Sequence, residues 1–365
     1  MDGHVLRVEF SFQNGHKIKW ASSSVLGTKY TANCRMVHGF TSSGILESQY
    51  QGFAEAGKIG NVGDKYIDNV YDKMGYMGTV TRTAEDSLLE QISEARNTDS
   101  YHENNRATVI TDCRHDSTAN AYHSTVAMLS YETKHMLATQ TVTKEEFRSL
   151  TVREVAHDFV PKIKNWLLTQ NIQNSFDTWH GTKGVAKAMK EISSGAQKWE
   201  GEKCFAELSD KQASVKRHFY YSMKNCSSPD DLRRRLLTIS NHTHCDPESK
   251  CKKPGYRCSK VKLTDAGAIA ALQKFILESR VYKLAEDSYL CRDTYWVESI
   301  INVILIYCPK RIHFADRTFE MRIALATLDW VNVRRPNRRT GHKNLVPKTF
   351  RFRERIWNRF FQVSY

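Results

Sequence analysis

The sequence predicts a mixed α/β fold, and three observations lead to this prediction. Two β-prone runs near the N-terminus are joined around Asn14 and Gly15. Three more β-prone runs lie between residues 107 and 142, and a weaker fourth run over 151–157 is followed by an acidic residue. Segments with helical spacing of apolar residues precede and follow these runs, so a sheet with helices packed on it is expected.

The first region, residues 1–105, is expected to hold a β-hairpin and helices. The runs 5–12 and 17–22 should pair, because Asn-Gly between two β-prone runs is the strongest short-range hairpin signal. Residues 42–96 show helical spacing punctuated by glycines, which predicts two or three helices there.

The second region, residues 106–195, is expected to contain the sheet. Its predicted strands are 107–112, 123–131, 135–142 and 151–157, the first three forming a meander. A helix is expected over 160–168, because Pro161 suits a first helical turn. A short extended segment over 175–180 and then a helix with lysines on one side complete the region.

Three further regions follow. Residues 196–279 are expected to be mainly helical, with one helix starting at Ser228 and another over 266–277. Residues 280–333 should hold an apolar helix over 292–307 and another over 318–330. The tail, residues 334–365, holds ten Lys/Arg against one Glu, interleaved with aromatic residues.

Composition limits the class of protein and of partner. The 365 residues carry a formal charge of +14 and a pI near 9.3, which favours a polyanionic ligand, with nucleic acid as the first candidate. The N-terminus lacks a signal-peptide pattern, and the longest apolar stretch, 299–308, is far shorter than the ~20 residues of a membrane span. These two features predict no membrane partner. The nine cysteines, an odd number, predict a reducing compartment, cytosol or nucleus.

Three acidic residues are candidates for chemistry. Metal-dependent phosphodiester cleavage commonly uses two divalent ions about 3.5–4 Å apart, which carboxylates on different elements of one sheet can hold. The candidates are Asp112 and Asp158 at two strand ends and Glu298 in an apolar helix. A strand-end Asp is more often a turn or cap residue, whereas Glu298, surrounded by apolar residues, needs a partner or a metal.

Several motifs in consistent order resemble those of transposase-like proteins found in several copies in animal genomes, which belong to the DDE transposase superfamily. The resemblance extends over residues 8–332. It rests on Asn14-Gly15-His16 with Trp20, Thr111-Asp112-Cys113-Arg114-His115-Asp116-Ser117, Asp177-Thr178-Trp179-His180, Arg292-Asp293-Thr294-Tyr295-Trp296-Val297-Glu298-Ser299 and Pro309-Lys310-Arg311-Ile312-His313-Phe314.

The resemblance implies a ribonuclease H-like sheet with an all-helical insertion before the last acidic residue. It implies that Asp112, Asp158 and Glu298 are the catalytic triad that binds two Mg²⁺ or Mn²⁺ ions. Asp177 and His180 match a Cys/Asp-x-x-His signature and would support the active site, and Asp116 is the alternative to Asp112.

The resemblance implies a DNA transposase that cleaves and joins strands, a homo-oligomer if active, in the nucleus. One departure supports a rival hypothesis. Parallel pairing of the third and fourth strands needs a crossover of at least about a dozen residues, and the chain offers only 143–150. An internally deleted copy would be a transposon-derived nuclear DNA-binding protein without catalysis. A ribonuclease acting on RNA–DNA hybrids is less favoured, because the motifs and the helical insertion are not expected there.

A cluster rich in Cys and His lies in the helical region and is a candidate structural zinc site. Four ligands would come from the set His242, His244, Cys245, Cys251 and Cys258. The spacing matches no strong zinc-finger pattern, so buried thiols and exposed histidines are the alternative.

Basic residues after the sheet and near the C-terminus are candidates for DNA contact. They are Lys183, Lys187, Lys190, Lys310, Arg311, Arg334, Arg335, Arg338 and Arg339. The three lysines are equally consistent with a solvated helix face. The tail fits phosphate contact with base stacking, a nuclear-targeting patch or a frayed basic end.

Overall fold

The structure is a computed structural model, in which the chain forms two compact units. It describes residues 2–98, 101, 106–115, 124–139, 151–195, 205–239, 263–310, 312, 314–334 and 348–363. The first unit comprises Met1–Ala107, Asp112–Thr151 and Trp296–Tyr365, and the second comprises Thr108–Thr111 and Val152–Tyr295. None of the described helices has the length and apolar character needed to cross a bilayer.

The first unit contains most of the helices at the two ends of the chain. Its elements are β1 (Arg7–Ser11), β2 (Lys17–Ala21), β3 (Val25–Leu26), β4 (Lys29–Tyr30), α1 (Thr31–Ser42), α2 (Glu47–Ala56), α3 (Asp64–Asp68), the π-helical turn η1 (Asn69–Lys73), α4 (Tyr76–Arg96), β6 (Ser124–Ser130), β7 (Met136–Thr139), α15 (Tyr295–Tyr307, from its second residue), α16 (Asp316–Asp329), the π-helical turn η5 (Trp330–Arg334) and α17 (Lys348–Val363). The predicted helices over 42–96 are confirmed, whereas α1 was not predicted.

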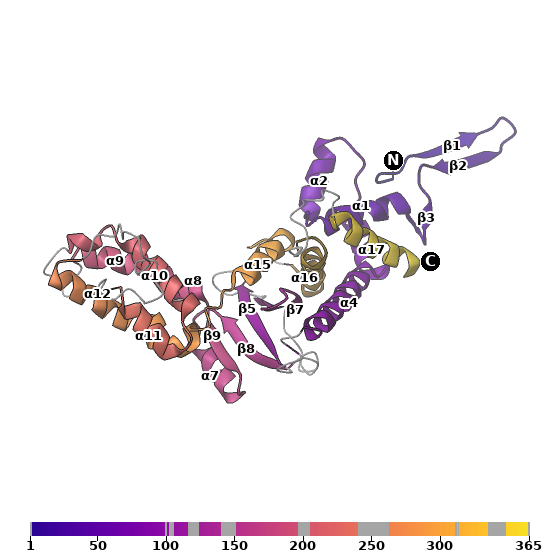
Figure 1. Ribbon diagram of the computed structural model, residues 1–365. Coiled ribbons are helices and arrows are strands. Elements are labelled where there is room, and N and C mark those ends of the chain that lie inside the picture. The colour runs from indigo at the N-terminus through magenta and orange to yellow at the C-terminus, as the bar shows by residue number, and fades with distance from the viewer. Residues whose placement is uncertain are drawn as a thin grey trace, which may run out of the picture. The chain divides into compact units, whose positions relative to one another are not determined.

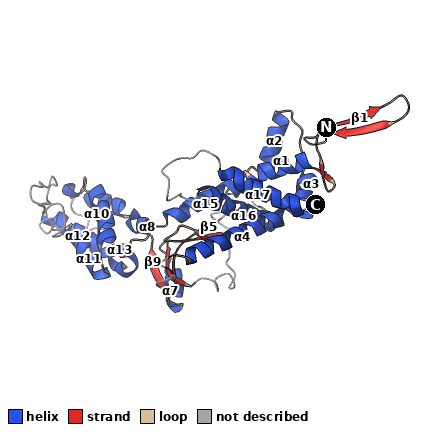
Figure 2. Cartoon of the chain, turned by 45° about the vertical axis from the view of Figure 1, so that its right-hand side comes forward, coloured by secondary structure: helices blue, strands red, loops and turns tan. Residues whose placement is uncertain are grey.

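The second unit contains a parallel strand pair and a group of helices (Figure 2). Its elements are β8 (Val152–His157), α7 (Pro161–Thr169), β9 (Gln173–Phe176), α8 (Thr178–Lys183), α9 (Val185–Ser193), the 3-10 turn η3 (Ala206–Leu208), α10 (Gln212–Asn225), α11 (Pro229–Leu237), α12 (Ala266–Glu278), α13 (Arg280–Lys283) and α14 (Ala285–Ser288). β5 (Ala107–His115) has residues in both units.

The central sheet is mixed, as the sequence predicts. Its strand order is β7-β6-β5-β8-β9. β6 and β7 run antiparallel, and β8 and β9, which are labelled in Figure 1, run parallel. The predicted fourth strand, 151–157, forms as β8, and its neighbours in the sheet are β5 and β9. The parallel β8–β9 connection holds α7, as a crossover of this kind requires. The short connection considered in the sequence analysis, residues 143–150, lies outside the described residues.

The predicted N-terminal hairpin is confirmed. Val8 faces Trp20 and Phe10 faces Ile18 across the two strands. The turn works because Gly15 has a φ of +80°, a left-handed conformation that glycine adopts without steric cost. The Phe12 N–H donates to the His16 carbonyl at 2.9 Å and closes the loop.

The core of the first unit is built around α16, which packs along α4 and is buried from Phe319 to Asp329 except for Glu320. The C-terminal helix α17 packs on α4 and α1. Its aromatic residues Phe352, Trp357 and Phe360 are 2%, 8% and 0% exposed. Base stacking by these three side chains, which the interleaved tail suggested, is therefore wrong: they stabilise the core.

The helices of the second unit enclose a separate apolar core, with Met189, Phe219, Leu232 and Leu272 buried in it. The expected helix starts are confirmed. The Ser228 hydroxyl accepts a hydrogen bond from the Asp231 N–H at the start of α11, so one of the otherwise unsatisfied donors of the first turn is paired.

Two local predictions after the sheet are wrong. The extended segment expected over 175–180 ends at Phe176, because Asp177 caps a helix that starts at Thr178. The single lysine-bearing helix is divided at Gly184 into α8 and α9.

Candidate metal centre

Two aspartates meet at one edge of the sheet because β8 and β9 are parallel. His157 is in register with Phe176, so the next residues along the two strands, Asp158 and Asp177, follow neighbouring strand ends. The Asp177 N–H donates to the His157 carbonyl at 3.0 Å and extends the ladder to this point. The carboxyl ends of parallel strands therefore place both side chains at the same edge.

Asp177 is buried and held by three donors. Its Oδ2 atom accepts the His180 N–H at 2.6 Å, which makes it the N-cap of α8, and its Oδ1 atom accepts the Thr294 N–H at 2.9 Å. The His180 ring supplies the third contact, 2.9 Å from Nδ1 to Oδ2. Because only 1% of this side chain is exposed and three of its roughly four acceptor positions are used, Asp177 is fixed in place.

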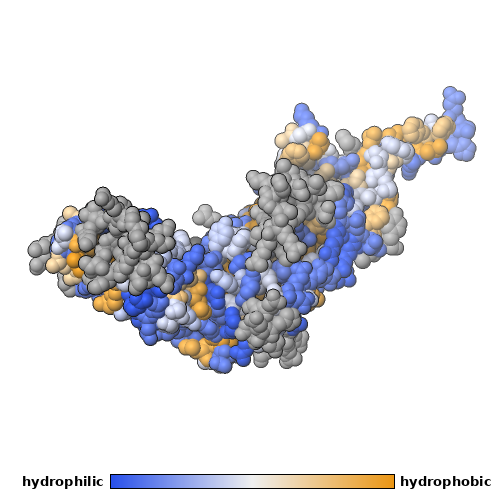
Figure 3. All heavy atoms as spheres, viewed as in Figure 1, coloured by the Kyte–Doolittle hydropathy of each residue, from blue (hydrophilic) through white to orange (hydrophobic). Residues whose placement is uncertain are grey.

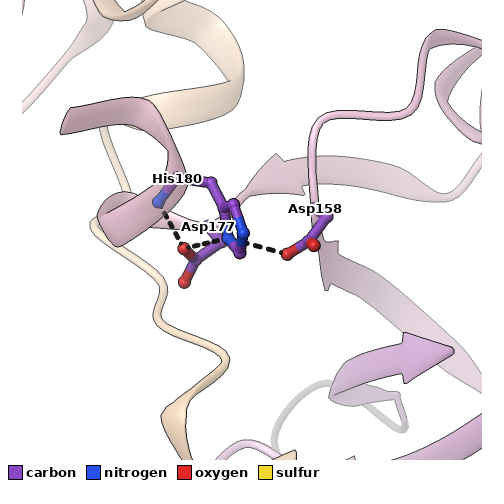
Figure 4. Close-up of side chains that lie close together, drawn as sticks. All are labelled: Asp158, Asp177 and His180. Carbon is purple, nitrogen blue, oxygen red and sulfur yellow. Dashed lines mark hydrogen bonds and ion pairs between the residues drawn. The ribbon is translucent and has the colours of Figure 1, made fainter. Parts of the chain in front are cut away.

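His180 lies between the two carboxylates, as Figure 4 shows. Its Nδ1 atom is 2.9 Å from Asp158 Oδ1 and 2.9 Å from Asp177 Oδ2. The Asp158 side chain is 40% exposed and that of His180 is 27% exposed, so the centre opens to solvent on the side of Asp158.

The same three residues offer ligand atoms that lie within 4.8 Å of one another. Two ligands at right angles, each ~2.1 Å from one metal, are ~3 Å apart, so the 2.9 Å separations suit a shared ion as well as a shared proton. Imidazole with carboxylates is a donor set for Mn²⁺ or Zn²⁺, whereas Mg²⁺ prefers oxygen ligands alone. The residues present therefore fit a divalent metal, with Mn²⁺ favoured over Mg²⁺.

A buried ion pair ties β8 to the segment before α15. Glu154, 1% exposed, accepts the Arg292 Nε–H at 2.8 Å on Oε1 and the Arg292 Nη2–H at 2.6 Å on Oε2. The Ser175 hydroxyl also donates to Glu154 Oε1, at 2.5 Å. The Arg292 carbonyl in turn accepts the Thr178 N–H at 2.9 Å. This bidentate pair fixes the segment that carries the Thr294 N–H donor to Asp177.

The structure brings Asp158, Asp177 and His180 together, three of the residues singled out from the sequence. Asp112 is not at a strand end as predicted, because β5 continues to His115; it lies half-buried within the strand. Glu298 lies half-buried in the first turn of α15, and both residues belong to the first unit. The convergence of these two acids with Asp158 on one metal site stays a prediction.

Other predicted site residues are placed as follows. Lys183 lies in α8, where its ammonium is 4.8 Å from the centre of the Trp179 ring, and Lys187 and Lys190 lie in α9. Lys310 is exposed just after α15, and Arg334 ends η5. The remaining predicted residues, Asp116, His242, His244, Cys245, Cys251, Cys258, Arg311, Arg335, Arg338 and Arg339, lie outside the described residues.

Four thiols in the described part of the chain form no disulfide. They belong to Cys34, Cys226, Cys291 and Cys308. Burial raises the pKa of the Cys34, Cys226 and Cys291 thiols, which disfavours the thiolate needed for metal binding or nucleophilic attack.

Sequence reasoning missed Glu154 and the capping role of Asp177. A signal for Glu154 was present, because a carboxylate among Val152, Val155 and Ala156 in a strand needs a partner. An Asp directly before a short helical run is likewise a known N-cap signal. Neither a family model nor a curated relative matches this chain.

Proposed function

We propose that this protein is a DNA transposase-like enzyme of ribonuclease H-like fold that cleaves and joins DNA strands with divalent metal ions. The observation that carries the proposal is the cluster of Asp158 with Asp177 and His180 at the end of the parallel strand pair. The motif resemblance had assigned Asp158 to catalysis and the other two residues to its support. Asp158 precedes Asp177 by 19 residues in the sequence, and it meets Asp177 and His180 only through the fold.

The sheet also supports the proposal. It is mixed, and a group of helices separates β9 from α15, the helix that carries Glu298. This is the arrangement that the resemblance implies for a ribonuclease H-like core with a helical insertion. Asp112 and Glu298 complete the proposed catalytic set on the strength of their motifs.

The chemistry follows from the roles of the three side chains. A bound divalent ion would polarise a phosphoryl oxygen and lower the pKa of a water ligand. Asp158 presents an exposed carboxylate to such an ion. Asp177 holds the His180 ring and the α8 backbone in place, and His180 directs Nδ1 toward both carboxylates.

A plasmid-nicking assay tests this function. The full chain should convert supercoiled plasmid to nicked circles with Mn²⁺ or Mg²⁺ and not with EDTA. Asp158→Asn and Glu298→Gln should each lower the nicking rate more than ~100-fold, since removing even a supporting residue of a metal site commonly costs 10–100-fold.

Asp230→Asn is the matched control, because its side chain is 92% exposed and its ion partner is Arg233 on the same helix. This variant should nick DNA at the wild-type rate. Wild-type nicking by Asp158→Asn would contradict the proposal.

The same protein samples distinguish the rival function, which is DNA binding without cleavage. Binding without metal-dependent nicking would favour it. The exposed Lys187, whose side chain is 83% accessible, offers a phosphate contact in either case. Lys187→Ala should reduce the salt dependence of DNA binding by about one unit of slope if this lysine contacts phosphate.

A further inference from the structure

The N-terminal hairpin carries an apolar face that lies open. Side chains alternate between the two faces of a strand, so Val8 and Phe10 of β1 share a face with Ile18 and Trp20 of β2. The flanking residues Leu6 and Phe12 continue this alternation at the two ends of β1. Phe10, Phe12, Ile18 and Trp20 are 51%, 50%, 55% and 50% exposed. Large apolar side chains in a contiguous exposed patch mark an interaction surface.

The opposite face of the hairpin is charged and internally paired. Lys17 Nζ lies 2.8 Å from Glu9 Oε1, and Lys19 Nζ lies 3.9 Å from Glu9 Oε2. Within its unit the hairpin projects away from the helices (Figures 1 and 2), and apolar residues follow its length in the space-filling view (Figure 3). A two-stranded hairpin of this kind is only marginally stable by itself, so covering its apolar face would stabilise the hairpin.

We propose that the apolar face of the hairpin docks on the same face of a second copy of this chain. An identical surface on two molecules forms a two-fold symmetric contact without any further partner. Phe and Trp side chains bury roughly 150–250 Å² each when they are fully covered. Covering the half-exposed side chains of this face would therefore remove on the order of 500 Å² of each copy's surface from water. The pair then buries on the order of 1,000 Å², the lower limit for a specific interface, and the dimer is reversible.

Face-to-face stacking fits the charges better than the alternatives. Pairing of the free strand edges would leave the apolar faces exposed, whereas two stacked sheets bury them and leave the charged faces in solvent. Nucleic acid would need cations beside the aromatic rings, but alternation places Arg7, Lys17 and Lys19 on the opposite face. The surface therefore fits a second apolar sheet rather than a phosphate backbone.

The test is the oligomeric state of the full chain by sedimentation at roughly 1 to 100 µM, where a reversible dimer of this size should be populated. The double variant Phe10→Thr with Trp20→Thr should weaken the dimer at least ~100-fold, because aromatic residues dominate interface energy. Threonine retains strand propensity, so the hairpin should persist. The matched control, Lys17→Thr with Lys19→Thr, changes two residues of β2 on the other face and should leave the dimer within ~3-fold.

A photo-cross-link locates the contact independently of these variants. Benzoylphenylalanine in place of Phe10 should join two chains, with the cross-links in residues 6–22 of the second copy. A monomeric wild type, a dimer unaffected by the double variant, or cross-links confined to the same chain would overturn the proposal. Loss of DNA binding in the double variant without a change in mass would overturn it in favour of a nucleic-acid surface. None of these readouts depends on nicking, so this proposal and the proposed function fail separately.

Discussion

Two places in the molecule, one in each unit, bury ionisable side chains in different ways. In the second unit, Glu154 and Asp177 are 1% and 2% exposed, and each receives three or more hydrogen-bond donors from side chains or backbone. In the first unit, His38 is 3% exposed and pairs through Nδ1 with the Tyr76 hydroxyl at 2.8 Å. Burial, reinforced by Arg35 and Arg353, lowers the pKa of His38 to about 3, so this side chain is neutral.

The difference between these two places indicates where a metal-binding site is expected. A buried polar group without directed charge partners is kept neutral and serves packing. Carboxylates that several donors hold in one orientation form a preorganised edge on which a metal can be placed. The strand-end edge of β8 and β9 is therefore the better candidate site, although both units bury polar residues.

The largest loss of stability is expected when the buried ion pair of Glu154 with Arg292 is broken. Arg292→Met leaves the carboxylate buried without its guanidinium, which should lower the free energy of unfolding by about 3–5 kcal/mol. Chemical denaturation measures this. The control Arg233→Met removes a guanidinium whose partners Asp230 and Glu286 are exposed, and it should cost less than about 1 kcal/mol. Equal costs for the two variants would show that the comparison of buried and exposed pairs is wrong.

The next largest expected effect distinguishes the structural role of Asp177 from the exposed position of Asp158. Asp177→Ala removes a helix cap and the anchor of His180, and it should lower the free energy of unfolding by about 1–3 kcal/mol. Asp158→Ala removes a side chain that is 40% exposed and should cost less than about 1 kcal/mol. Isothermal titration with Mn²⁺ should show weaker binding for both. A larger stability loss for Asp158→Ala would reverse the assigned roles.

The smallest effect concerns His38 and pH. Its pKa is about 3 in the folded state, below the ordinary histidine value of 6.5, so the unfolded chain takes up the proton first as the pH falls. The contribution of neutral His38 to the free energy of unfolding is complete above pH 6.5 and is lost progressively toward pH 3. Between pH 7 and pH 5 the wild type should therefore lose about 2 kcal/mol of stability that His38→Gln retains. Denaturation at the two pH values measures this difference, and parallel pH profiles would contradict it.

The fold was predictable where local signals were strong. The Asn14-Gly15 turn, the apolar runs that became β5 and β6, and the cap at Ser228 all act through neighbouring residues. The helix α1 was missed, and the C-terminal aromatics were misjudged. Their burial depends on α4 and α16, which are distant in the sequence.

The candidate site was predictable only in part for the same reason. Asp158, Asp177 and His180 could be chosen from motifs, but their meeting depends on the parallel register of β8 and β9. The Arg292 partner of Glu154 lies 138 residues away, so no local pattern predicts the pair. Long-range pairing of this kind is decided by the fold and not by spacing.

Crystals of the full chain grown with Mn²⁺ test the central claim most directly, through the anomalous signal of the metal. We expect an anomalous peak ~2.2 Å from a carboxylate oxygen of Asp158 and from His180 Nδ1, in the cluster that Figure 4 shows. Crystals that bind Mn²⁺ only elsewhere, with His180 Nδ1 still hydrogen-bonded between the two carboxylates, would contradict the assignment of this cluster as a metal centre.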